Sequence, residues 1–393
     1  MRKFFVIFIG LLLTCVTSVI FPIKTQCALA QEDLGTEGAI KEPIKKQLES
    51  LELGELEKYY EELNLSESFD SVSLKDLIYN LITGEQTISP TLIVNVITGT
   101  IKTNIGSILK LVVTIVLIVA ASKISSSLTT ENSSGGIVGF VVIIIILSMI
   151  SALITDSLKG TIDGIRNIQS VVEVVSPILI SLLALIGASG STIIYQPTIV
   201  FLVGGVIEFA VYVLSGIVSL YFVLSIIGAI TDHIKINKFK SFLSSCFKFS
   251  LGAVFTIFVG YLSLNGITAS AKDGISIKTA KFALRSYLPL IGGYVSESYE
   301  VFRAGSVLIK NSIGVIGVVI LFSIIIVKVI NLILYSLSFK LTSALIEPFG
   351  SNKITEFLSS LGTIFNFLLT TIVCVFMMCF ILLVVIISTA NVV

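Results

Sequence analysis

The chain has no tryptophan, a single histidine and few charged side chains. His233 stands alone among 393 residues, so a metal site built from several histidines of this chain is excluded. Only 13% of the residues are charged and 54% are hydrophobic, whereas soluble domains carry about 25% charged residues. This shortage of charge excludes an ordinary soluble domain. It predicts an all-α, polytopic membrane helical bundle.

Motifs for nucleotide binding and hydrolysis are also missing. The sequence contains no G-x-x-x-x-G-K-[ST], no H-E-x-x-H and no G-x-S-x-G. Its five cysteines form neither a disulfide framework nor a C-x-x-C pair, because two lie in the first 30 residues and the others in or beside apolar segments. We therefore expect no enzyme, no cofactor and no metal site. Energy for any transport would come from a separate ATPase subunit or an ion gradient.

Residues 1–30 have the pattern of a secretory signal peptide. Arg2 and Lys3 precede the apolar run Phe4–Phe21, and Ala28-Leu29-Ala30 is a small-residue cleavage site. Cleavage after Ala30 is the prediction, and an uncleaved first membrane helix is the alternative. Either way, the residues that follow are expected outside the cytoplasm.

Residues 31–104 form an acidic region, with 14 Asp and Glu against 6 Lys. Apolar periodicity predicts helices over Glu42–Asn64, Leu74–Ile82 and Thr91–Thr103, with Ser73 capping the second. Two interpretations stay open: a solvated region packed on its own membrane domain, or a docking surface for proteins outside the membrane. Candidate docking residues are Glu55, Glu57, Glu61 and Glu62. Nucleic acid is not an expected partner.

Residues 105–393 read as a polytopic membrane domain embedded in lipid. Its apolar runs are Ile105–Ser122, Gly136–Thr155, Ser170–Ala188, Thr198–Ile230, Phe242–Leu264, Ile313–Phe339 and Gly362–Ser388. The run over Thr198–Ile230 would be about 50 Å long as one helix, against a hydrocarbon core of about 30 Å. Two crossings with a turn near Glu208 or Ser215-Gly216 are therefore predicted, which gives about seven to eight transmembrane helices.

A start outside the cytoplasm makes Asp156–Gln169 an outer loop. The same count places the loop around Lys235, Lys238 and Lys240 in the cytoplasm, in agreement with the positive-inside rule. Residues 272–310 conflict with that rule, because they are expected outside and yet carry six Lys and Arg. These charges could face the acidic region of the chain instead of lipid.

A broken element is predicted over residues 283–311. Its apolar part, Ala283–Val295, is shorter than the roughly 20 residues of a spanning helix, and Pro289 and the pair Gly292-Gly293 interrupt it. Such backbone is tolerated at membrane depth only where protein or water satisfies its polar groups. We expect a re-entrant or surface-lying element that contributes to a pathway or to packing.

Polar residues within the apolar runs extend this candidate pathway. Glu208, Lys328 and Asn331 are its members, because an ionisable group at a helix centre costs about 2.5–3.5 kcal/mol. Glu208 has the alternative of a turn at the membrane surface. Lys328 faces either a partner helix or an aqueous path, and a pair between Glu208 and Lys328 inside the bundle is a further option.

Two stretches carry a resemblance to a known family. LIYNLITGE (Leu77–Glu85) and YLPLIGGYVSESYEVFRAGSVLIKNSIGVIGVVIL (Tyr287–Leu321), with the signal peptide and multi-pass layout, resemble the stage III sporulation protein AE family of endospore-forming Firmicutes. The resemblance implies a multi-pass subunit in the mother-cell membrane around the forespore. It also implies a secretion-like channel complex with other membrane and intermembrane-space subunits, needed for forespore development after engulfment. The alternatives are a non-conducting scaffold and a stand-alone transporter of a small solute.

Overall fold

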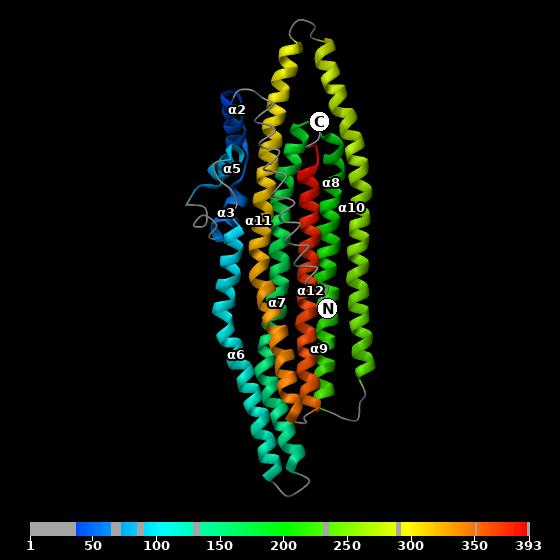
Figure 1. The fold of residues 1–393 in the computed structure, drawn as a ribbon. Coiled ribbons are helices and arrows are strands. Elements are labelled where there is room, and N and C mark those ends of the chain that lie inside the picture. Colours follow the sequence, from blue (N-terminus) through cyan, green and yellow to red (C-terminus); the bar gives the residue numbers. More distant parts are fainter. Residues whose placement is uncertain are drawn as a thin grey trace.

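The computed structural model describes residues 37–63, 72–84, 90–128, 134–230, 236–287, 292–349 and 352–390. Three short helices at one end of the molecule are α2 (Glu37–Ser50), α3 (Gly54–Glu62) and α5 (Leu74–Thr83). The long helices are α6 (Pro90–Leu128), α7 (Ser134–Leu185), α8 (Ser189–Phe201), α9 (Ser215–Ile230), α10 (Asn237–Tyr287), α11 (Gly292–Ile346) and α12 (Asn352–Ser388). They run side by side along one axis (Figure 1), so the expected helical bundle is confirmed.

Six helical segments of the described residues are long and apolar enough to cross a membrane. They are Thr98–Ala121, Ile144–Leu185, Ser189–Ile230, Asn237–Asn265, Phe302–Ile346 and Lys353–Ser388. The prediction of seven to eight was too high, because it placed a loop over residues 156–169 and a turn within residues 198–230, and in both places the chain continues as one helix. The structure has two crossings fewer than expected. Because two is an even number, the helices after residue 230 still begin and end on the expected sides, relative to the start of α6.

The first difference from the prediction concerns the outer loop expected over Asp156–Gln169. These residues lie inside α7, which runs without a break for 52 residues, about 78 Å at 1.5 Å per residue. The segment stays helical because it is amphipathic: Ile154, Ile165 and Ile168 are buried on one side. The charges on its other side form a polar face of the helix and not a loop.

The second difference concerns the turn expected near Glu208 or Ser215-Gly216. Residues 189–230 instead form one helical segment, in which two π-helical stretches, Leu202–Ile207 and Ala210–Leu214, join α8 to α9. Glu208 lies between these stretches. The wider π turns continue the helix without ending it, and the Ser215 hydroxyl donates back to the Val211 carbonyl.

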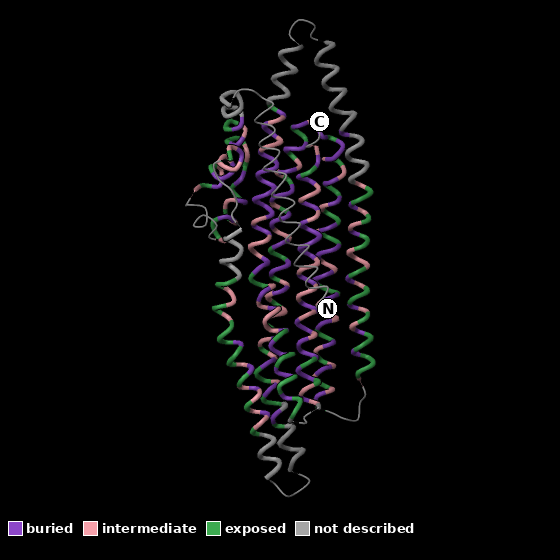
Figure 2. The backbone as a smooth tube through the Cα atoms, viewed as in Figure 1, coloured by how far each residue is buried: buried purple, intermediate pink, exposed green. Residues whose placement is uncertain are grey.

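Helices α11 and α12 form the centre of the bundle. In each of their spans 67% of the most apolar window is buried, against 22% for α6 and α10, and Figure 2 shows their inner faces as buried. Glycines allow the close packing: a methyl group at Gly317 would lie 2.9 Å from Val175 Cγ1 of α7, and Gly314 abuts Ile387 of α12. Gly252 of α10, by contrast, faces open space.

The N-terminal helices follow the sequence prediction in part. The Ser73 hydroxyl accepts from the Asp76 N–H at 3.2 Å, and Gly84 ends α5 in the left-handed conformation at φ 75°. The helix expected over Glu42–Asn64 is two helices, because the chain breaks at 51–53 between α2 and α3. The helix expected to end at Thr103 continues as α6 into the first span, so the boundary at residue 104 falls inside a helix.

The broken element becomes the join between two long helices. α10 ends at Tyr287 and α11 begins at Gly292, while Pro289 lies outside the described residues. Gly292 and Gly293 form the first turn of α11, which continues through residue 311 to Ile346. The described part of the predicted element is therefore the start of a full-length helix and not a short re-entrant segment.

Candidate functional site

Four charged side chains of alternating sign lie on one face of α7. The spacing i, i+3, i+7, i+10 places them on one side of a helix, and all four are exposed. They are Asp156, Lys159, Asp163 and Arg166, and together they are called the charged face below. The opposite side of α7, with Ile165 and Ile168, is buried in the bundle. The charged face therefore points away from the bundle interior.

Contacts beside the charged face fix its depth. A methyl group at Gly160 would lie 3.4 Å from Lys328 Nζ of α11, and one at Gly164 would lie 2.9 Å from Ile372 Cδ1 of α12. Lys328 and Ile372 are both close to the middle of the apolar spans of α11 and α12. Four charges on the outside of the bundle thus lie level with the middle of these two helical spans, a position called mid-span below.

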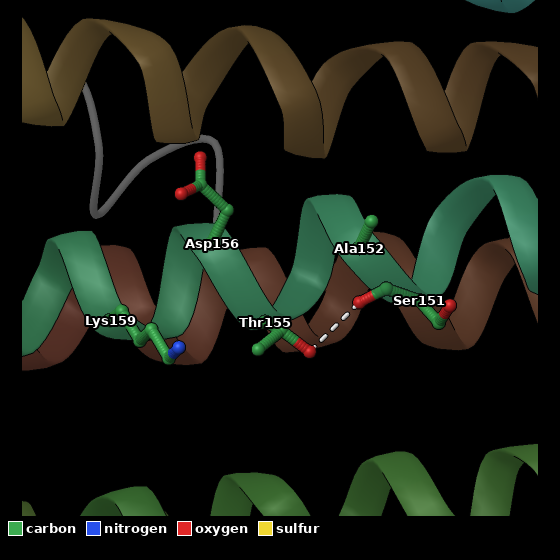
Figure 3. Close-up of a pocket in the computed structure, with 5 residues that line it drawn as sticks. All are labelled: Ser151, Ala152, Thr155, Asp156 and Lys159. Carbon is green, nitrogen blue, oxygen red and sulfur yellow. Dashed lines mark hydrogen bonds between the residues drawn. The ribbon is translucent and has the colours of Figure 1, made fainter.

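A hollow of about 370 Å³ borders the charged face. Its lining residues are Ser151, Ala152, Thr155, Asp156 and Lys159, all on adjacent turns of α7 and mostly small (Figure 3). The Thr155 hydroxyl donates to the Ser151 carbonyl at 2.9 Å, so the polar groups of these small residues are partly satisfied within the helix. The described residues contain no group of three or more metal-ligating side chains.

The predicted pathway residues are not brought together. Lys328 is exposed beside Gly160, and Asn331, one turn further along α11, has a buried Oδ1 without a hydrogen-bond partner. Glu208 is half-buried between the π-helical stretches and forms no ion pair with Lys328. Of the predicted set, Lys328 and Asn331 lie near the charged face, whereas Glu208 belongs to another helix.

A second polar cluster, missed by the sequence analysis, joins four helices at one end of the bundle. Asp273 of α10 accepts from the backbone N–H of Ser191 at 3.0 Å and also from its hydroxyl. Tyr195 Oη lies 2.8 Å from Thr389 Oγ1, and Lys310 Nζ donates to the Thr389 carbonyl. All five residues are buried. No local sequence pattern singles these residues out, because their contacts join helices that are far apart in the chain.

Burial also explains part of the basic excess in residues 272–310. Lys310 is 0% exposed and Arg303 is 5% exposed, so both cations lie inside protein and neither belongs to a loop. The Nε and Nη2 atoms of Arg303 have no hydrogen-bond partner among the described residues. The conflict with the positive-inside rule therefore rests on the remaining basic residues.

The N-terminal helices pack against the same end of α11. The Gln47 side chain donates to the Phe302 carbonyl at 3.5 Å and lies 3.4 Å from Ser306 Oγ, and a methyl group at Gly305 would lie 3.3 Å from Ile44 Cγ1. Burial raises the pKa of Tyr60, whose hydroxyl donates to the Val72 carbonyl at 3.1 Å.

The predicted docking carboxylates all lie on α3. Glu55, Glu61 and Glu62 are exposed and Glu57 is half-buried. On the other side of this short helix, Leu56 and Tyr60 are buried. α3 therefore presents an acidic surface while its apolar side holds it to the rest of the protein.

The fold and the charged face define a class: a multi-pass helical membrane protein with an acidic helical region at one end and a polar exterior at mid-span. Residues 72–390 match the family model for stage III sporulation protein AE. The chain belongs to that family.

One curated relative sets the scale of the similarity. The chain is 27% identical over 229 residues to stage III sporulation protein AE of Bacillus subtilis (strain 168), an alignment that covers 58% of this chain and 57% of the relative. The match thus spans a little over half the length of each protein. No solved structure matches the chain.

Proposed function

We propose that this protein is a membrane platform or channel subunit of a secretion-like complex that links mother cell and forespore, and that forespore development after engulfment requires it. The observation that carries the proposal is the charged face of α7 at mid-span. In lipid each of its side chains would cost about 2.5–3.5 kcal/mol. Water or protein must therefore cover this face, as expected of a subunit that lines a polar path.

The proposed placement is the mother-cell membrane around the forespore, with the N-terminal helices outside the cytoplasm after signal cleavage. Lys238 and Lys240 begin α10 at the end of the bundle opposite to these helices, and Lys353 begins α12. The ion pair between Lys240 and Glu356, at 3.0 Å, joins these two helix starts. A basic end of this kind favours the cytoplasmic side.

The acidic surface of α3 is the proposed contact for subunits in the intermembrane space. It lies beside the membrane domain, on the side where those subunits would be found in this placement. Energy for transport would come from a separate ATPase subunit or an ion gradient.

A non-conducting scaffold is the second candidate, and the acidic surface of α3 favours it. Recruitment of partners needs only α3 and a stable bundle, and it requires no water at mid-span. The third option, a stand-alone transporter built on a Glu208–Lys328 pair, loses its support because these residues do not pair.

Cysteine labelling in sporulating cells separates the first two candidates. Thr155→Cys and Lys328→Cys, each in a variant without the native cysteines, are treated with a membrane-impermeant thiol reagent. Ile257→Cys is the control, because Ile257 is 61% exposed on an apolar face of α10. A water-filled path predicts labelling at 155 and 328, none at 257, and a loss of heat-resistant spores on labelling. Unlabelled positions in a protein that still supports sporulation would favour the scaffold.

A further inference from the structure

The side chains of the charged face and the neighbouring Lys328 of α11 form no ion pairs with one another. Its side chains stand three or four residues apart, which is the spacing of ion pairs along a helix. Nevertheless, none of the four forms an ion pair within 4.0 Å, and the pair found among the described residues is Lys240–Glu356. Four unpaired charges on the outer surface at mid-span require compensation from another molecule.

The surface beside these charges suits a closely packed helix. Ser151, Ala152 and Thr155 form one border of the hollow described above, and small side chains of this kind let two membrane helices approach closely. Lipid chains would fill such a hollow without specific contacts. They also offer no hydrogen-bond or ionic partners to the charged side chains that follow the hollow along α7. The small residues and the charges share one face, so a single interface would satisfy both.

We propose that a second copy of this chain packs on the charged face, so that the α7 helices of neighbouring copies meet around an axis along the membrane normal. Such an axis keeps the two helices parallel and places equal residues at equal depth. Asp156 and Lys159 differ in height by about 4.5 Å, so Asp156 of one copy reaches Lys159 of the next. Asp163 and Arg166 repeat this relation two turns further along.

The alternation of sign is what selects a second copy over an unrelated partner. Along a face with the order acid, base, acid, base, each acid of one copy has a base of the other copy about one turn away, so each copy supplies the counter-charges that the other lacks. An unrelated membrane protein would need an independently matched series at the same depth. This inference deepens the proposed function and rests on it, because the paired charges between copies would form one wall of the proposed polar path.

Cross-linking in native membranes tests the seam. Ala152→Cys and Thr155→Cys, each without the native cysteines, are treated with an oxidant and a short bifunctional maleimide, and Ile257→Cys is the matched control. We expect a dimer band at 152 and 155 at least fivefold stronger than at 257. Two differently tagged copies expressed together must both be present in that band. Monomers alone, or a cross-link only to a protein of another mass, would overturn the proposal.

A charge exchange tests the pairing itself. In the Thr155→Cys variant, Asp156→Lys places two like charges at adjacent heights and is expected to reduce the dimer at least fivefold. The exchanged variant, Asp156→Lys with Lys159→Asp, keeps opposite charges at positions 156 and 159 of neighbouring copies and is expected to restore the dimer. An unchanged dimer in both would contradict pairing through these charges. If a position forms dimers but is not labelled by the impermeant reagent, the second copy is supported and the aqueous path is overturned. If it is labelled but forms no dimers, the aqueous path is supported and the second copy is overturned.

Discussion

Lys328 of α11 passes directly over Gly160 of α7, where a methyl group would lie 3.4 Å from its Nζ atom. The glycine gives the ammonium group room beside the helix backbone. Asp156 and Asp163 stand four residues before and three residues after this glycine, so the cation lies at the edge of the charged face. Lys328 is thereby part of the polar exterior at mid-span instead of a member of the apolar centre.

Filling this space should displace Lys328. Gly160→Leu places a branched side chain where the Lys328 ammonium lies, so we expect fewer heat-resistant spores and a lower melting temperature in detergent. Gly160→Ala is the control: it adds only an ordinary contact with a flexible side-chain end and gains up to about 1 kcal/mol of helix propensity. Adding Lys328→Met to Gly160→Leu should recover stability, because methionine lacks the ammonium group that clashes with the new leucine. Equal behaviour of the Ala and Leu variants would contradict the contact.

Close packing in the centre gives a sharper contrast between two glycines. Gly317→Ala puts a methyl group 2.9 Å from Cγ1 and 3.1 Å from Cγ2 of Val175, and a β-branched side chain cannot easily rotate away. We expect a loss of about 1–3 kcal/mol in the free energy of unfolding. Gly252→Ala, which meets nothing within 4 Å, should be neutral or stabilising. Denaturant titration of both variants in the same detergent measures the difference.

Composition was sufficient for the class of fold, but not for the division into helices. Long apolar runs such as Ile313–Phe339 predicted spans correctly, since lipid admits only self-satisfied helices. Charges at 156–169 and the length of 198–230 predicted breaks, and there the helix instead continues. Hydropathy averages over all faces of a helix, so it cannot distinguish a polar loop from a helix with one polar face. The signal that would have distinguished them is the one-sided spacing of Asp156, Lys159 and Asp163.

The candidate site was predictable only in fragments for a related reason. Lys328 and Asn331 were recognised as polar residues inside an apolar run, but their neighbour Gly160 is a helix-packing partner from 168 positions earlier in the chain. The buried contact between Asp273 and Ser191 is likewise a matter of tertiary packing. Single residues of these types are common in loops, so no local pattern indicates that they meet.

The buried pair Tyr195 and Thr389 should couple α8 to the end of α12. Their oxygens lie 2.8 Å apart, and Thr389 Oγ1 also lies 2.7 Å from the Val385 carbonyl. Tyr195→Phe removes this hydrogen bond while the Thr389 hydroxyl keeps its bond to the Val385 carbonyl, with an expected loss of about 0.5–1.5 kcal/mol. Thr389→Val should cost at least as much. The double-mutant cycle isolates their interaction, and additive losses would mean that the two helices are not coupled through these hydroxyls.

Replacing Lys240 should lower the free energy of unfolding more than replacing Glu356, its partner in the ion pair. The Lys240 side chain is 9% exposed and also donates to Ser360 at 3.2 Å, whereas the Glu356 side chain is 53% exposed. Glu356→Gln should therefore change the unfolding free energy by less than about 1 kcal/mol, with the effect reduced further by salt. Lys240→Ala should cost more, because it also removes a buried aliphatic stem. A larger effect of the glutamate variant would reverse this assignment.

Different substitutions in and beside the N-terminal helices should affect the docking of intermembrane partners and the packing of these helices on the bundle. Replacing Glu55, Glu57, Glu61 and Glu62 with glutamine should leave α3 in place, because the buried Leu56 and Tyr60 hold it. If this acidic surface docks a partner, the variant will lose heat-resistant spores while its protease pattern stays native. Gly305→Leu is the matched contrast, since it drives a side chain against Ile44 and should release α2 as a protease-sensitive segment. Normal sporulation of the quadruple variant would remove α3 from the docking surface, and an altered protease pattern would show that the carboxylates serve packing instead.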